Sequence, residues 1–243
     1  MEQTPSASSS EVADPLSGFS GLWRWLWRHP VFPLLAACAG SALLSVVLLF
    51  TRKAITGQGR LGFIPFNLIL AFIPLAFLLL FERSQKRGHA ILCSMLWLLF
   101  FPNAPYMLTD LVHLDKRLGP ASWLDLLALV AAAWAALLGG MITLRFMQDR
   151  VRLHRSPVMG HGFVLTVLFL TSIGIYIGRF LRFHSWHALL KPQDLIQETT
   201  ARFLGSMADP MAWPFTLAVF GLLCCIHYSL SAFAHASRRG ALV

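Results

Sequence analysis

The sequence predicts an all-α fold, namely a polytopic membrane helix bundle of about six transmembrane helices, the third of which is broken near Pro102 and Pro105. Three observations predict this fold. Hydrophobic residues make up 56% of the 243 residues, which is more apolar surface than one water-soluble core can bury. Charged residues make up only 13%. The apolar residues also fall into long runs separated by short basic connections, as in successive membrane spans.

The excess of basic residues indicates a phospholipid environment. The formal net charge is +9 at pH 7, but the basic residues lie between apolar runs, and no aromatic-basic recognition module or zinc-finger spacing accompanies them. We therefore expect the lipid bilayer as a partner and no nucleic acid. No nucleotide fingerprint, phosphate-binding glycine loop or catalytic signature motif occurs. The sequence thus indicates no cofactor and leaves open whether the protein is an enzyme.

The chain begins with two segments that differ from a membrane span. Residues 1–20 are serine-rich and acidic, which predicts a disordered tail because a cleavable signal peptide opens with basic residues. In residues 21–30, Trp23 and Trp27 share one helical face and Arg24 and Arg28 share another, as in an interfacial segment at headgroup depth. We expect residues 31–236 to form a single transmembrane domain.

The first two spans are predicted near residues 31–50 and 62–81. Each is long enough, at about 1.5 Å per residue, to cross a hydrocarbon core of about 30 Å. The second span contains Asn67 and Pro74. We expect the Asn67 amide to hydrogen-bond to another helix, because hydrocarbon offers it no partner. Pro74 lacks a backbone donor and should bend the helix.

The third apolar run is too short to cross a membrane alone. Residues 89–101 number 13, or about 20 Å of helix. The span must therefore continue through residues 100–114 as a broken helix whose second part begins near Asn103, which could cap it. If the helix resumes there, one polar face is expected from residues at positions i, i+3, i+4 and i+7. These residues are Tyr106, Thr109, Asp110 and His113.

The fourth and fifth spans, near 122–144 and 162–181, carry small residues that favour close helix packing. In the fourth span they recur every four residues, at Ala128, Ala132, Ala136 and Gly140. In the fifth span they are Gly174 and Gly178. Residues 145–161 between the two spans are predicted to form a basic connection.

A short helix on the membrane surface is predicted at 192–205, followed by a sixth span near 212–234. His227 and Tyr228 lie inside the sixth span, where we expect hydrogen bonds within the bundle. The densest short basic connections follow the second and fourth spans. They favour a multi-pass protein of the cell (inner or plasma) membrane with cytoplasmic N- and C-termini.

Polar residues from two distant segments should meet on one membrane face. An even number of crossings separates residues 100–114 from the end of the fifth span, so both emerge on the same face, the extracytoplasmic one in the favoured orientation. We expect Asp110 to pair with Arg179, because an unpaired charge in a bilayer is costly. The candidate polar site comprises Asn103, Tyr106, Thr109, Asp110, His113, Tyr176, Arg179, Arg182 and Trp186, with Asn67, His184 and His187 as secondary candidates.

Three blocks, residues 66–75, 101–114 and 174–186, resemble the bacterial integral membrane proteins grouped as domain of unknown function 1361. The resemblance covers roughly residues 30–235, and its most specific blocks read Pro-Asn-Ala-Pro-Tyr and Gly-Arg-Phe-Leu-Arg. The family commonly has Asn-Ser-Trp-Asp where this chain reads His184-Ser185-Trp186-His187, and Trp in place of Phe66. The resemblance implies a multi-span bacterial membrane protein and adds no catalytic role.

Three functions fit these residues. The first is binding or translocation of an anionic small molecule or lipid headgroup, which the planar donors of Arg179 and Arg182 would hold. The second is an enzyme that acts on a lipid-linked substrate with Asp110 or His113 as general base. Its metal-dependent variant rests only on two His-containing pairs whose spacing is common by chance, so we expect no metal. The third is an accessory subunit whose small-residue stripes bind a partner membrane protein or a second copy of the chain.

Overall fold

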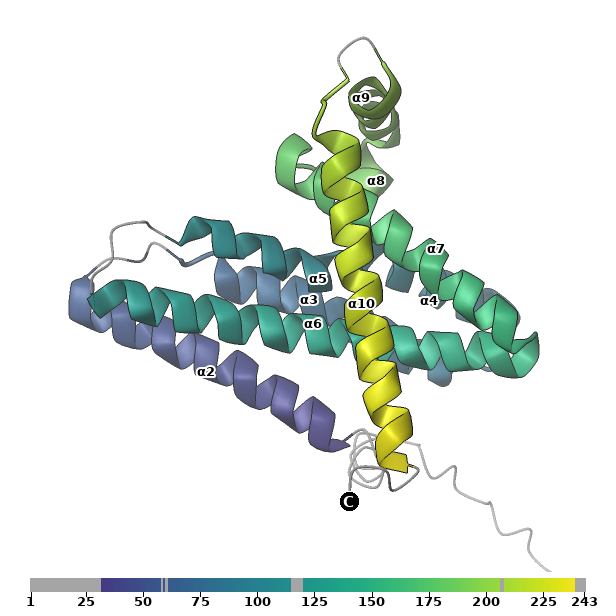
Figure 1. Ribbon diagram of the computed structural model, residues 1–243, viewed down its shortest axis with the longest axis horizontal. Coiled ribbons are helices and arrows are strands. Elements are labelled where there is room, and N and C mark those ends of the chain that lie inside the picture. The colour runs from purple at the N-terminus through teal and green to yellow at the C-terminus, as the bar shows by residue number, and fades with distance from the viewer. Residues whose placement is uncertain (1–31, 58, 60, 115–119, 206–207, 239–243) are drawn as a thin grey trace, which may run out of the picture. The chain divides into compact units, whose positions relative to one another are not determined.

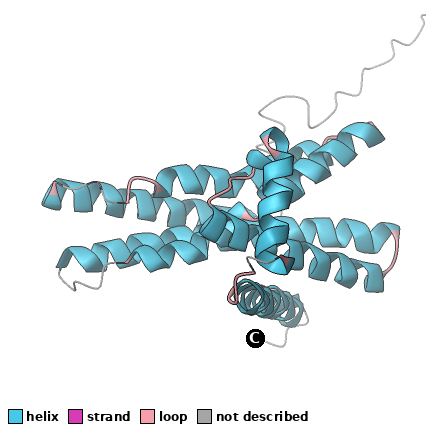
Figure 2. Cartoon of the chain, turned by 90° about the horizontal axis from the view of Figure 1, so that it is seen from above, coloured by secondary structure: helices cyan, strands magenta, loops and turns pink. Residues whose placement is uncertain are grey.

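The computed structural model describes residues 32–57, 59, 61–114, 120–205 and 208–238. The predicted tail and interfacial segment, residues 1–20 and 21–30, lie outside the described residues. The chain divides into two compact units, residues 1–37 and 38–243, and the helix packing described below lies within the second. Every regular element among the described residues is a helix (Figure 2), which confirms the all-α prediction.

Six stretches of the described chain are long and apolar enough to cross a membrane (Figure 1). The first two are α2 (Phe32–Thr56) and α3 (Ile64–Glu82), and the third comprises α4 (Arg87–Phe100), the single turn α5 (Asn103–Tyr106) and the 3₁₀ helix η1 (Met107–His113). The others are α6 (Pro120–His154), α7 (Pro157–Tyr176) with the π-helix η2 (Ile177–Leu181), and α10 (Ala212–Arg238). Two short helices, α8 (His187–Leu190) and α9 (Pro192–Leu204), precede α10. The protein is therefore a multi-pass membrane protein with a bent third span.

Helix α6 is longer than the sequence predicts. The expected basic connection at 145–161 is mostly helical, since α6 continues to His154 and α7 begins at Pro157. No proline or glycine interrupts residues 145–154, and side-chain pairs one turn apart support the helix. Arg145 Nε donates to Asp149 Oδ2 at 3.1 Å, and Arg152 Nη1 lies 3.7 Å from Asp149 Oδ1.

The small residues of α6 and α7 let the broken third span approach closely. A Cβ added to Gly140 of α6 would lie 2.7 Å from Ala104 Cβ. A Cβ on Gly174 of α7 would lie 3.2 Å from Pro102. Gly178 leaves room in the same way for the Tyr106 ring, 3.2 Å from its added Cβ. The predicted close-packing signatures are thus present, and they seat the break in the third span.

Helix α2 packs on the start of α6 through polar contacts. Ser41 Oγ donates to the Ala131 carbonyl at 2.9 Å, and Ser45 Oγ donates to the Ala128 carbonyl at 2.8 Å. A buried ion pair joins Arg52 of α2 to Asp125 of α6. These contacts cover the alanine-rich face of α6, where Ala128 is buried.

The other end of the bundle is packed around Trp97 of α4. Its indole donates to Thr143 Oγ1 of α6 at 3.1 Å and its ring stacks on Phe163 of α7 at a centroid distance of 6.2 Å. Helix α10 joins this end through His227 Nε2, which lies 3.2 Å from Gln148 Oε1. The predicted hydrogen bond of His227 within the bundle is therefore present.

Candidate functional site

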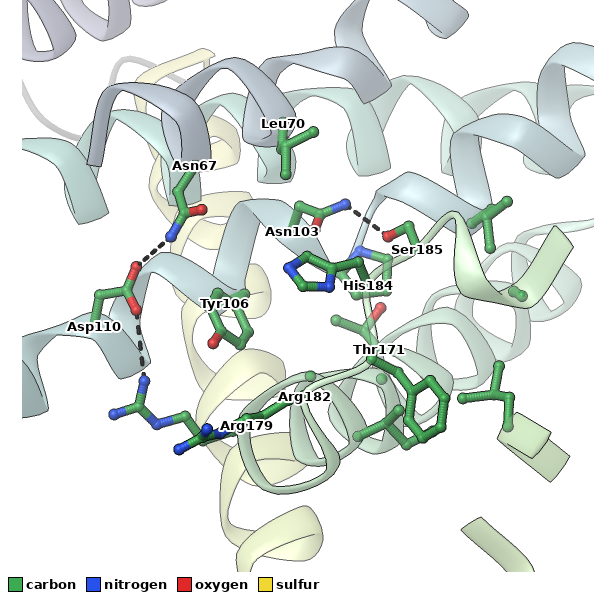
Figure 3. A pocket seen from close by; sticks show the side chains of 18 of the residues that line it. Asn67, Leu70, Asn103, Tyr106, Asp110, Thr171, Arg179, Arg182, His184 and Ser185 are labelled. Carbon is green, nitrogen blue, oxygen red and sulfur yellow. Dashed lines mark hydrogen bonds and ion pairs between the residues drawn. The ribbon is translucent and has the colours of Figure 1, made fainter. Parts of the chain in front are cut away.

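A cavity of about 610 Å³ lies between α3, the break that follows α4, and the end of α7 (Figure 3). The loop after η2 also contributes to its wall. The polar lining residues are Asn67, Asn103, Tyr106, Asp110, His113, Thr171, Arg179, Arg182, His184 and Ser185. Six of the nine primary candidates named from the sequence line the cavity, namely Asn103, Tyr106, Asp110, His113, Arg179 and Arg182, as do the secondary candidates Asn67 and His184.

 Eight of the twelve candidates therefore line it, and the other four, Thr109, Tyr176, Trp186 and His187, do not.

Asp110 joins α3, η1 and the end of α7. Its side chain is only 2% exposed. Oδ2 accepts a hydrogen bond from Asn67 Nδ2 at 3.0 Å, and Oδ1 lies 3.6 Å from Arg179 Nη1. His113 Nδ1 lies 3.8 Å from Oδ1. The ion pair with Arg179 and the interhelical hydrogen bond of Asn67, both expected from the sequence, are present, and Figure 3 shows Asp110 between these two partners.

The expected polar stripe on the third span is divided, because residues 107–113 form a 3₁₀ helix with three residues per turn. Asp110 and His113 stay aligned at this spacing and line the cavity. Thr109 falls on another face, where its Oγ1 donates to the Tyr106 carbonyl at 2.8 Å. The expectation of one shared face assumed the α-helical period and was wrong for Thr109.

Asn103 holds the break in the third span to the loop after α7. Its Nδ2 donates to the Phe100 carbonyl and to Ser185 Oγ, both at 2.9 Å. The expected capping role is wrong, since Pro102 is the N-cap of α5 and Asn103 is its first helical residue. Asn103 instead binds the preceding turn and a segment 82 residues away.

The end of α7 places two arginines on the cavity. Residues 177–181 form a π-helix, and Arg182 then adopts the left-handed conformation, with φ 59° and ψ 28°. A non-glycine residue in this region is uncommon, and the conformation turns the chain so that residues 183–185 also line the cavity. Arg179 pairs with Asp110. Among the described residues, the exposed Arg182 guanidinium has no hydrogen-bond or ion-pair partner.

His184 lies on the cavity wall between aromatic neighbours. Its ring stacks on Trp186 with centroids 4.4 Å apart, and its backbone N–H donates to His187 Nδ1 at 2.8 Å. Burial, and to a lesser degree the neighbouring His187, lowers the pKa of His184. The folded structure therefore favours the neutral form of His184. Trp186 and His187 support this segment of the wall and do not line the cavity.

Comparison with known proteins identifies the family. Residues 66–226 match a family described as protein of unknown function, DUF1361. The chain belongs to the DUF1361 family. No curated protein and no solved structure matches it. In this DUF1361 protein the matched region includes all of the cavity lining except Phe63.

Tyr176 of the DUF1361 protein lies away from the cavity, contrary to the sequence-based expectation. Gly174 and Gly178 line the cavity, and Tyr176 is two residues from each, or about 200° around the helix. Its hydroxyl donates to Asp209 Oδ2 at 2.6 Å. This hydrogen bond, with a second from the Met211 N–H, lowers the pKa of Asp209. Tyr176 thus fastens α7 to the segment before α10.

Sequence reasoning did not select two polar lining residues. Ser185 accepts the hydrogen bond from Asn103, and its place between two candidate residues was the only signal for it. Thr171 is fully buried, and its hydroxyl has no hydrogen-bond partner among the described residues. Thr171 lies beside Ser172 in the apolar run of the fifth span, and its spacing does not mark it as a lining residue.

The described part of the chain contains no group of three or more His, Cys, Asp and Glu side chains arranged to hold a metal ion. Asp110 and His113 contact each other and Arg179. His184 and His187 contact each other through the backbone of His184. These contacts place charged and hydrogen-bonding side chains on the cavity wall.

Proposed function

We propose that this DUF1361 protein binds the anionic group of a small molecule or lipid headgroup in the cavity at the end of α7, as a receptor or as a step in translocation. The observation that carries the proposal is the charge balance of the cavity. Among the described residues that line it, two are arginines, Arg179 and Arg182, and one carries a carboxylate, Asp110. Because Asp110 pairs with Arg179, Arg182 supplies the positive charge that has no internal partner.

The donors around Arg182 suit an oxyanion. A guanidinium presents planar N–H groups that match phosphate or carboxylate oxygens. Tyr106 and Ser185 add hydroxyl groups to the same cavity. Asp110 acts indirectly in this proposal, since it fixes the Arg179 guanidinium at the cavity wall.

The proposed location is the extracytoplasmic side of the cell membrane. The densest short basic connections, after the second and fourth spans, would then be cytoplasmic. The cavity lies at the opposite ends of these spans, where η1 and η2 end. This orientation also gives cytoplasmic N- and C-termini.

The accessory-subunit hypothesis has less support, because the small residues of α6 and α7 pack against other parts of the same chain. Gly140 contacts Ala104, and Gly174 contacts Pro102. Ala132 and Ala136 of α6 are fully buried. These faces therefore offer no free surface for the partner membrane protein or second copy that the sequence suggested.

Ligand-dependent stabilisation tests the proposal. Thermal unfolding of the purified protein in mild detergent is measured with inorganic phosphate, glycerol phosphate and phosphatidylglycerol as probes. At least one probe should raise the unfolding temperature, because a ligand that binds only the folded state stabilises it. Arg182→Ala should weaken that binding at least about tenfold, since a charge-assisted hydrogen bond contributes about 1.5–3 kcal/mol.

Arg83→Ala is the matched control. Arg83 is an exposed arginine at the end of α3 and does not line the cavity, so its loss changes the net charge equally. Its variant should retain the stabilisation. The proposal fails if no probe stabilises the protein, or if both variants lose the effect equally.

A further inference from the structure

The charged residues of the cavity lining and the leucines that α3, α4 and α7 contribute to it lie at different positions along these helices. On α7, Leu170 and Arg179 both line it and lie nine residues apart, or about 13 Å along a helix. On the third span, Leu99 lines it one turn before Asn103. On α3, Leu70 lines it one turn after Asn67. Each wall thus contributes both a polar and an apolar residue.

On all three helices, the leucine lies deeper in the membrane than the polar residue. The third span and α7 both end at the cavity face, whereas α3 begins there. Residues before Asn103 and before Arg179 therefore lie deeper in the membrane, as do residues after Asn67. The leucines of all three helices consequently line the deep end of the cavity, and the charged groups line its end nearer the membrane surface.

The leucine-lined end of the cavity includes a half-exposed side chain on a membrane-spanning helix. Leu170 lines the cavity and is 46% exposed in a membrane-spanning helix. A ligand with a long apolar chain could therefore enter from the bilayer, and its chain could extend past Leu170 toward lipid.

Thr171 supplies one polar group beside the apolar end. Its buried hydroxyl lacks a partner among the described residues, and a buried polar group without a hydrogen bond is unfavourable. Thr171 lines the cavity next to Leu170 in the chain (Figure 3). An ester, ether or hydroxyl oxygen next to a ligand's apolar chain could accept its hydrogen bond.

From these observations we infer that the ligand is a membrane amphiphile with an oxyanion headgroup, held by Arg182 and Arg179 at the outer end, while its apolar chain occupies the leucine-lined end. This inference rests on the proposed function and names its ligand class. A water-soluble anion would leave the leucine-lined end filled with water, which is unfavourable in proportion to the apolar area left wet. An amphiphile satisfies both ends.

Three probes with shared parts test the inference: dihexanoyl phosphatidic acid, glycerol phosphate and dihexanoyl glycerol. Their dissociation constants are compared by native mass spectrometry of the full chain in mild detergent. Phosphatidic acid should bind at least about tenfold more tightly than glycerol phosphate, because each buried methylene contributes about 0.8 kcal/mol, or about fourfold. Dihexanoyl glycerol should bind at least about tenfold more weakly than phosphatidic acid, since it lacks the phosphate that accepts the charge-assisted hydrogen bonds.

Two substitutions separate the chain end from the headgroup end. Leu170→Trp should weaken phosphatidic acid binding and leave glycerol phosphate binding unchanged. Leu165→Trp is its control, since Leu165 is 41% exposed on the same helix and does not line the cavity. Thr171→Val keeps the shape of the side chain and removes its hydroxyl, so it should weaken phosphatidic acid binding by about two- to tenfold without unfolding the protein.

The outcomes distinguish the two proposals. If glycerol phosphate binds as tightly as phosphatidic acid and Arg182→Ala weakens both, the anion site stands and the amphiphile inference is overturned. If dihexanoyl glycerol binds as tightly as phosphatidic acid, or if Arg182→Ala changes nothing, the proposed anion site is overturned as well. Binding of no probe overturns both proposals.

Discussion

The ion pair between Asp110 and Arg179 is tested most directly by removing one charge at a time. Arg179→Gln leaves a carboxylate that is 2% exposed with the Asn67 amide and His113 as neighbours. Breaking a buried pair in this way should lower the free energy of unfolding by about 3–5 kcal/mol. Asp110→Asn should cost less, about 1.5–3 kcal/mol, because the Arg179 side chain is 20% exposed and can be hydrated from the cavity.

The double variant measures the interaction itself. With both charges removed, no uncompensated charge remains. The decrease in the free energy of unfolding of the double variant should therefore be smaller than the sum of the two single decreases by about 1–3 kcal/mol. Equilibrium unfolding by SDS titration in mixed micelles measures all four proteins under one condition. Strictly additive losses would refute the conclusion that Asp110 and Arg179 interact, and with it the role of Asp110 in fixing Arg179.

Three further predictions concern packing, the segment before α10 and pH. Gly140→Ala should lower the free energy of unfolding by about 1–3 kcal/mol, because the added methyl overpacks the contact with α5; Gly221→Ala, with open space around it, should raise it by about 0.5–1 kcal/mol. Tyr176→Phe should cost about 1 kcal/mol and speed proteolytic cleavage near Asp209, and an unchanged cleavage rate would contradict the fastening role of that hydrogen bond. The lowered pKa of His184 means that the folded protein binds fewer protons than the unfolded chain below about pH 6.5, so stability should fall as pH drops through that range. The unfolding temperature should consequently decrease less between about pH 7.5 and pH 5.5 in His184→Gln than in the parent protein, and equal decreases would contradict this assignment.

The number of spans and the pairing of Asp110 with Arg179 could be predicted because both depend on simple rules. The length of each apolar run, compared with the thickness of the hydrocarbon core, predicts the membrane spans. The parity of crossings places residues 100–114 and the end of the fifth span on one face, and the cost of an unpaired charge then selects the pair. The same length rule predicts the break near Pro102, since the third apolar run alone is too short.

Other parts of the site depend on local geometry that the sequence does not specify. Thr109 was misplaced because the prediction used the α-helical period where the chain forms a 3₁₀ helix. Tyr176 was misplaced because its partner, Asp209, lies in a segment 33 residues away. The π-helix before Arg182 and the buried hydroxyl of Thr171 arise from tertiary packing and leave no pattern in the residue types.

The uncharged part of α6 is matched in length to the hydrocarbon core of a typical bilayer. Residues 126–144 contain no charged side chain, and roughly 19 residues of helix span about 28 Å, close to a typical hydrocarbon core of about 30 Å. Asp125 and Arg145 bound this stretch, and Gly140 holds the third span against it. A thicker or thinner bilayer would therefore have to deform or tilt the helix. Lipid composition could in this way set how deeply the arginines of the cavity lie beneath the phosphate layer.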